Sequence, residues 1–264
     1  MPSFWENLRF GGDRGFDDMH GYQGLDMVAY VSHPPPSEGT SWPAVIVIQE
    51  IFGVNEHIQK VCDRFAANGY VAVAPALFHR EHPNPKLGYS PEDMQAGINY
   101  MSVMNDEEIV TDINETVNYI LGGDNRTPYN RTAGQKVGIV GYCVGGRITY
   151  LAATSCSRLD AAVAYYPGRV LVPFGDDNPA PIDLTGNIKI PLMGQFGDQD
   201  GNPSPADVET IEARLDAAGV SYDFKMYAGA GHGFNCDERD SYHAASAEDA
   251  WARTLAFFGQ HLKS

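Results

Sequence analysis

Residues 136–146, KVGIVGYCVGG, hold the most informative pattern in the sequence. The run KVGIV predicts a β-strand, and a helix is expected from Arg147 onward. Between them, Gly141, Cys143 and Gly145 form a G-x-nucleophile-x-G pattern in which cysteine stands where serine is usual. A nucleophile on so tight a turn has strained backbone angles, and its neighbours must be small because the strand and the helix crowd the turn. The pattern therefore predicts a strand-to-helix elbow that carries Cys143.

An elbow of this kind gives the Cys143 thiol a chemical advantage over an ordinary buried cysteine. The helix N-terminus places a partial positive charge beside the sulfur, which favours the thiolate. The backbone N–H of Val144 is then positioned to donate to an oxyanion. The competing interpretation, a small core residue, is preferred for Cys62, Cys156 and Cys236. For Cys143 the order of strand, elbow and helix favours a nucleophile.

The chain around the elbow alternates between strand-like and helix-like segments. Such alternation predicts an α/β fold, with a mostly parallel central sheet covered by helices on both faces. No break in composition suggests a second domain, so residues 1–264 are expected to form a single domain with residues 1–24 as an N-terminal extension. Expected strands span residues 25–31, 44–50, 71–74, 136–140, 161–166, 191–196 and 222–227, and expected helices follow Asn55, start from Arg147 and span residues 106–121, 204–218 and 242–262.

A nucleophilic thiol needs a base and a group that orients the base, and both have candidates downstream. His232 lies between glycines after the predicted strand 222–227, which suits an exposed imidazole. Asp198 and Asp200 both follow the predicted strand 191–196, at the strand end where sites in open α/β sheets gather. The spacing from the strand favours Asp200 over Asp198. The order nucleophile, acid, histidine is that of α/β-hydrolase sheets.

Four motifs in this order resemble the dienelactone hydrolase family (carboxymethylenebutenolidases) of the α/β-hydrolase superfamily. They are VIVIQEIFGVN at residues 45–55, the elbow GYCVGG at residues 141–146, Gly-x-x-Asp at residues 197–200 and GHGF at residues 231–234. The resemblance extends from about residue 25 to the C-terminus. It implies the α/β-hydrolase fold and a hydrolase that cleaves the ester bond of a dienelactone-like, carboxylated lactone.

The resemblance also implies roles for individual residues. Cys143, His232 and Asp200 match the family's catalytic triad. Glu50 matches a glutamate that contacts the resting thiol and takes part in forming the thiolate when substrate arrives. The backbone N–H of Ile51 would be the second oxyanion donor.

Family substrates carry a carboxylate beside the lactone, and arginines hold it because a planar guanidinium can bind a carboxylate through two hydrogen bonds. Arg80 falls where the first family arginine is expected. The second family arginine follows the histidine by four residues, where this chain has Cys236, and Arg239 is the candidate substitute. Tyr165 and Tyr166 either line the pocket or pack as core aromatics, and the sequence favours neither interpretation.

The implied reaction is acyl transfer to Cys143, followed by hydrolysis of the thioester by water that His232 activates. It needs no metal ion or organic cofactor, and the motif His79-Arg80-Glu81-His82 has no third metal ligand nearby in the sequence. Three alternatives remain. One is a broader cysteine-dependent carboxylesterase or thioesterase for acyclic esters. Another is a catalytically silent α/β-hydrolase relative that serves as a binding module. The last is a thiol-redox protein with Cys143 in a disulfide.

Charge limits the partners further. The 264 residues include 34 Asp and Glu against 18 Lys and Arg, a net charge of −16, which argues against nucleic-acid and anionic-membrane binding. No apolar run approaches the ~20 residues needed to cross a bilayer, and MPSFWENLRF lacks a signal-peptide pattern, so a cytoplasmic location is the default. The expected partner is a small-molecule lactone or ester, and the oligomeric state stays open. An anionic substrate would need a locally positive pocket, so loss of Arg80 is expected to impair carboxylated substrates most.

Overall fold

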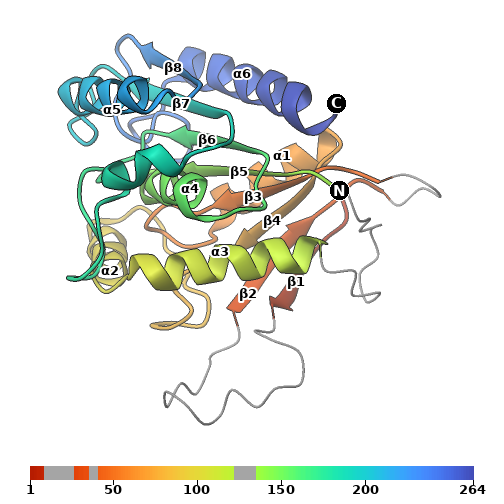
Figure 1. The fold of residues 1–264 in the computed structure, drawn as a ribbon. Helices are drawn as coiled ribbons and strands as arrows, with labels where there is room; N and C mark the ends of the chain where they lie inside the picture. The colour runs from red at the N-terminus through yellow and green to blue at the C-terminus, as the bar shows by residue number, and fades with distance from the viewer. Residues whose placement is uncertain (9–26, 36–40, 122–134) are drawn as a thin grey trace.

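The protein is built on an eight-stranded sheet (Figure 1). The structure, a computed structural model, describes residues 1–8, 27–35, 41–121 and 135–264. The strand order is β1-β2-β4-β3-β5-β6-β7-β8, with β2 antiparallel to both of its neighbours and all other pairs parallel. The strands are β1 Ser3–Leu8, β2 Met27–Ser32, β3 Ala44–Ile48, β4 Val71–Pro75, β5 Val137–Tyr142, β6 Ala161–Tyr165, β7 Leu192–Gly197 and β8 Tyr222–Tyr227.

Helices cover both faces of the sheet and bury two apolar layers. Side chains of α3, α4, α5 and the 3-10 helix η2 pack in one layer, and those of α1 and α6 pack in the other. Figure 1 shows α3 and α4 in front of the sheet and α1 behind it. No helix in the described ranges combines the length and hydropathy that a membrane crossing requires. The helices are α1 Glu56–Ala67, α2 Pro91–Ser102, α3 Asp106–Leu121, α4 Val144–Ser155, η2 Pro181–Asn187, α5 Pro205–Ala218 and α6 Ala244–Leu262.

The expected α/β class, with a mostly parallel sheet and helices on both faces, is confirmed. Within residues 1–24, predicted above as an N-terminal extension, Ser3–Leu8 form β1 and pair antiparallel with β2. Helix α2 was not expected; Ser90 caps its first turn and Pro91 begins it. Of the strand expected at residues 25–31, the first two residues lie outside the described ranges.

The elbow between β5 and α4 is a tight junction. Strand β5 lies between β3 and β6, so the helix that follows must begin beside the ends of both neighbours. A Cβ on Gly145 would lie 2.5 Å from the carbonyl oxygen of Gln49 and 2.6 Å from that of Ile48. Cys143 itself has φ 58° and ψ −120°, a strained conformation that costs ~1–3 kcal/mol. The helix can start this close to β3 only because residue 145 has no side chain.

Replacing Gly145 with alanine should therefore destabilise the protein, since the added methyl meets backbone atoms that cannot rotate away. We expect the free energy of unfolding in urea to fall by ~1–3 kcal/mol. Gly259→Ala in α6 is the matched control, because nothing lies within 4 Å of a Cβ at that position. This control should gain ~0.5–1 kcal/mol from helix propensity. A Gly145→Ala variant as stable as the wild type would contradict the steric account of the elbow.

Candidate active site

Residues expected to act together follow the ends of parallel strands at one edge of the sheet. Glu50 follows β3, Cys143 follows β5, Tyr166 follows β6, Asp200 follows β7 and His232 follows β8. The carboxyl ends of parallel strands meet at one edge, which is where open α/β sheets place their sites. The topology alone thus brings residues separated by up to 182 positions into one cluster (232 − 50 = 182).

Cys143 is held by the backbone on both sides. It is the N-cap residue of α4 and is partly exposed. Its N–H donates to the Tyr165 carbonyl at 3.1 Å, and its own carbonyl accepts from the N–H of Gly146 at 3.0 Å. These bonds fix the residue at the positive end of the α4 dipole, where a thiolate is favoured. No two of the four cysteines are joined in a disulfide.

Two backbone N–H groups, at the start of α4 and in the turn after β3, can donate to a ligand's oxygen. Within the described part of the chain, neither the Val144 N–H nor the Ile51 N–H donates to a backbone carbonyl. Val144 is the first residue of α4, and Ile51 lies in the turn after β3 in which the Gly53 N–H donates to the Glu50 carbonyl at 3.4 Å. Helix-start amides have no partner within their own helix and are available for such contacts.

His232 contacts Asp200, whereas Asp198 has other partners. The Nδ1–H of His232 donates to Asp200 Oδ2 at 2.9 Å, and the N–H of Asn202 donates to Asp200 Oδ1 at 2.8 Å. The Asp198 carboxylate instead accepts from the Gly229 N–H at 2.8 Å. The structure therefore brings Asp200 to the imidazole, while Asp198 supports the turn that precedes it.

The protonation of His232 depends on Cys143. Burial alone would lower the pKa of His232, but the charge of the Cys143 sulfur and hydrogen bonds to Asp200 and Cys143 outweigh it and raise the pKa from 6.5 to about 10. The imidazole thus lies between a carboxylate and a thiol and interacts with both. This is the arrangement of a nucleophile, a base and a group that orients the base.

A buried ion pair stands beside this trio. The Nη1 of Arg239 donates to Glu50 Oε1 at 3.1 Å, and the exposed fractions of the two side chains are 16% and 2%. Burial would lower the pKa of Arg239, but the negative charges of Glu50 and Cys143 raise it. Gly233 makes room for the guanidinium, because a Cβ there would collide with Arg239. Arg239 therefore brings a positive charge into the cluster that contains Cys143.

The two tyrosines after β6 have different surroundings. The Tyr166 ring lies 5.2 Å from the His232 ring, and its buried hydroxyl has no hydrogen-bond partner among the described residues. Tyr166 also has a positive φ of 36°, which turns it away from the strand direction. The Tyr165 hydroxyl instead forms a 2.7 Å hydrogen bond with the Thr254 hydroxyl of α6. Tyr166 belongs to the cluster, and Tyr165 is part of the core.

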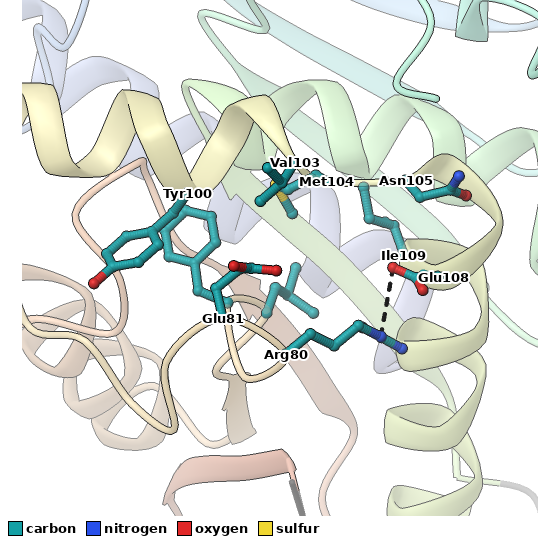
Figure 2. Close-up of a pocket in the computed structure, with 10 residues that line it drawn as sticks. Arg80, Glu81, Tyr100, Val103, Met104, Asn105, Glu108 and Ile109 are labelled. Carbon is teal, nitrogen blue, oxygen red and sulfur yellow. Dashed lines mark ion pairs between the residues drawn. The ribbon is translucent and has the colours of Figure 1, made fainter. Parts of the chain in front are cut away.

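Arg80, the residue expected to bind a substrate carboxylate, is paired with two acidic side chains of the protein in this structure. Its Nη1 and Nη2 donate to the two oxygens of Asp112 at 2.6 and 2.8 Å, and its Nε lies 3.5 Å from Glu108 Oε2. Figure 2 shows Arg80 and Glu108 at the wall of a cavity of about 290 Å³. The lining of this cavity contains none of the residues clustered around Cys143. A two-point pair with a buried carboxylate leaves little of the guanidinium for a ligand.

The sequence analysis did not predict a buried ion pair in the first turn of the helix that follows Cys143. Arg147, in the first turn of α4, is fully buried and donates to both oxygens of Asp106 at 2.6 and 2.9 Å. Its Nε and Nη2 also donate to the carbonyls of Arg169 at 3.1 Å and Val172 at 2.7 Å. The pair thereby fixes the chain that follows Tyr166. An arginine directly after the glycines of a buried elbow was the available signal.

Side chains that could ligate a metal ion gather at one place in the described ranges. Ligand atoms of Glu50, His57 and Cys236 all lie within 4.8 Å of one another. His79 belongs to no such group, and its Nε2 lies 3.2 Å from Asp112.

Comparisons with known proteins give one consistent family. The model of the dienelactone hydrolase family matches residues 27–262. A protein of Escherichia coli strain K12, provisionally named a carboxymethylenebutenolidase, is 38% identical over 242 residues, which cover 90% of this chain and 84% of that protein. A Synechocystis protein with the same provisional name is 37% identical over 241 residues, which cover 91% of this chain and 94% of that protein. The crystal structure of a provisionally named dienelactone hydrolase from Klebsiella pneumoniae has a TM-score of 0.79 and 31% identity, covering 98% of this chain and 99% of that one.

The contacts of His232 predict its titration. Because its pKa is raised to about 10, the ring should stay protonated through neutral pH and lose its proton only as pH rises through about 10. Cys143→Ala removes the largest raising influence and Asp200→Asn the next, so both variants should titrate at lower pH than the wild type. NMR of the histidine ring signals measures this directly. A His232 that titrates at its ordinary pKa in all three proteins would rule out the coupling.

Proposed function

The chain belongs to the dienelactone hydrolase family and is a carboxylic ester hydrolase, and we propose that it cleaves the ester bond of a lactone with Cys143 as the nucleophile. The observation that supports this most is the position of His232, which bonds to Asp200 on one side and interacts with the Cys143 thiol on the other. The elbow that carries Cys143 adds a strained, partly exposed thiol at a helix N-terminus. These features together suit a nucleophile rather than a structural cysteine.

The reaction proceeds in two halves. The Cys143 thiolate attacks the lactone carbonyl, and the ring C–O bond breaks as the His232 imidazolium gives its proton to the leaving oxygen. The acyl group is then a thioester on Cys143. His232, held by Asp200, takes a proton from water, and the resulting hydroxide attacks the thioester carbonyl. The C–S bond breaks, the carboxylic acid leaves, and the thiolate returns.

Both tetrahedral intermediates place negative charge on the former carbonyl oxygen. We assign the Val144 and Ile51 N–H groups to that oxygen, because neither donates to another backbone carbonyl in the described ranges. Removal of one such donor typically costs ~100- to 1,000-fold in rate. Glu50 precedes Ile51 in the same turn. Where Cys143 enters the cycle as the thiol, the proposal gives Glu50 the thiol proton when substrate arrives, and Glu50 returns that proton to the thiolate after the carboxylic acid has left.

The substrate's own carboxylate is assigned to Arg239. The charge of this guanidinium interacts with Cys143, and Glu50 bonds to only one of its nitrogens. Both Nη atoms of Arg80 already bond to Asp112, so the proposal gives Arg80 a structural part. Tyr166 completes the pocket wall beside His232.

The second candidate is a broader cysteine-dependent esterase or thioesterase for acyclic esters. It is favoured by Cys236, which stands where the family pattern has an arginine and so leaves Arg239 as the one arginine in the cluster. A silent binding module is disfavoured, because such a protein needs no buried carboxylate on an imidazole beside a strained cysteine. A cytoplasmic location stays a prediction.

Removing the Cys143 sulfur should abolish turnover if it is the nucleophile. We expect Cys143→Ala to lower kcat by ~10⁴-fold or more on a dienelactone, since the loss of a nucleophile in a triad is of this order. Hydrolysis of the lactone and of p-nitrophenyl acetate would be followed by absorbance. Cys156→Ser is the control, because its thiol is buried at the end of α4 away from the elbow. Equal turnover by Cys143→Ala and wild type would refute the mechanism. A wild-type protein that hydrolyses the aryl ester but not the lactone would favour the second candidate.

The assignment of Arg239 has its own test. We expect Arg239→Gln to lower kcat/KM for a carboxylated lactone by ~10- to 100-fold, the value of ~1.5–3 kcal/mol for a hydrogen bond to a charged group. The methyl ester of the same lactone should lose much less. The ratio of the two rates within one variant does not depend on how much enzyme is folded. Arg80→Gln is the comparison, and a larger change of ratio in that variant would place the carboxylate at Arg80 instead.

A further inference from the structure

A second set of reactive side chains includes the Glu50 carboxylate. Glu50, His57 and Cys236 come from the turn after β3, from the first turns of α1 and from the loop after His232. Their exposed fractions are 1%, 3% and 0%, and one ligand atom from each lies within 4.8 Å of the other two. Burying a carboxylate, an imidazole and a thiol together costs free energy unless hydrogen bonds, an ion pair or a metal ion compensate for the lost water.

The two ring nitrogens of His57 have different surroundings. Its Nδ1 lies 3.7 Å from Asp237 Oδ1, so the carboxylate favours the tautomer with the proton on Nδ1. That leaves a lone pair on Nε2, which is buried and has no hydrogen-bond partner in the part of the chain that the structure describes. A ligating histidine commonly has its other ring nitrogen paired with a carboxylate in this way.

We propose that Glu50, His57 and Cys236 form a binding site for Zn²⁺. A thiolate, an imidazole and a carboxylate are the three donor types that Zn²⁺ takes in proteins, and three protein ligands leave a fourth position for water. Binding requires Cys236 to release its proton to solvent, after which the thiolate bonds to the ion. The thiol now donates to the Tyr89 hydroxyl at 3.2 Å, and that hydroxyl can turn to donate to the thiolate.

Charge supports the same conclusion. The Cys236 thiolate and the Glu50 carboxylate together neutralise a divalent cation, and Asp237 adds a further carboxylate behind His57. The positive charge of Arg239 repels a metal ion, but its guanidinium bonds to Oε1 of Glu50 and leaves Oε2 for the metal. A zinc ion at this place would hold Glu50 away from the Cys143 proton and inhibit hydrolysis. This inhibition rests on the proposed function, whereas the binding does not.

Binding is tested with Co²⁺ as a spectroscopic probe of the full-length protein. We expect a thiolate-to-cobalt charge-transfer band that Zn²⁺ abolishes by competition, with one proton released per ion. Cys236→Ser should remove the band, and His57→Gln should weaken cobalt binding by at least ~10-fold. Cys156→Ser and His82→Gln are the matched controls, because neither residue belongs to the cluster, and both should bind as the wild type does.

The main rival is zinc capture by the catalytic pair itself. Cys143→Ala separates the two, because it removes that pair and leaves the proposed ligands intact. Retention of the band in Cys143→Ala and its loss in Cys236→Ser support the inference. Loss of the band in Cys143→Ala, or its absence from the wild type, overturns it. Circular dichroism checks that each variant is folded, and His57→Gln gives a second test should Cys236→Ser be unfolded. An enzyme that hydrolyses esters yet binds no cobalt would refute the zinc site and leave the proposed function intact.

Discussion

The contact of Gly145 with the backbone at the end of β3 is the constraint on which the site depends. Because residue 145 has no side chain, α4 begins directly against the carbonyls of residues 48 and 49. Gly146 makes the same kind of approach to the Tyr165 carbonyl, where a Cβ would lie at 2.6 Å. One turn of helix thus fixes the ends of three adjacent strands relative to each other. This packing, rather than contacts of their own, positions the Cys143 sulfur and the two candidate oxyanion donors.

Buried carboxylates, each paired with a cation, hold the loops around that turn. Asp106 holds Arg147, Glu50 holds Arg239, and Asp200 holds His232. Such pairs gain little net stability, because desolvation of both charges offsets their attraction, but breaking one leaves an unpaired buried charge. Their effect here is positional. Each pair joins a residue at or after a strand end to a different segment of the chain, so the loops of the site have few alternative arrangements.

The sequence predicted those features that depend on residues close together in the chain. The elbow, the alternation of strands and helices, and the choice of Asp200 as the partner of His232 follow from glycine spacing, buried runs and the distance from a strand end. The pairing of Arg80 with Asp112 could not be predicted, because the two residues are far apart in the sequence. The apolar positions of α3, which carries Asp112, gave no sign of a buried acid. Helix α2 escaped detection since it buries little besides Gly97 and so lacks an apolar stripe.

Glu50 is the group whose partner can change. In this structure its charge is matched by Arg239, within a protein whose net charge is −16. A carboxylated substrate that takes Arg239 leaves Glu50 with an unmatched buried charge, which is costly. The carboxylate must then acquire a cation, and the proton of Cys143 is the one that the reaction provides. A zinc ion held by Cys236 and His57 would satisfy the same carboxylate without producing a thiolate. In these two proposals, a proton and a metal ion compete for the negative charge of Glu50, and their competition would set whether the Cys143 thiol is activated.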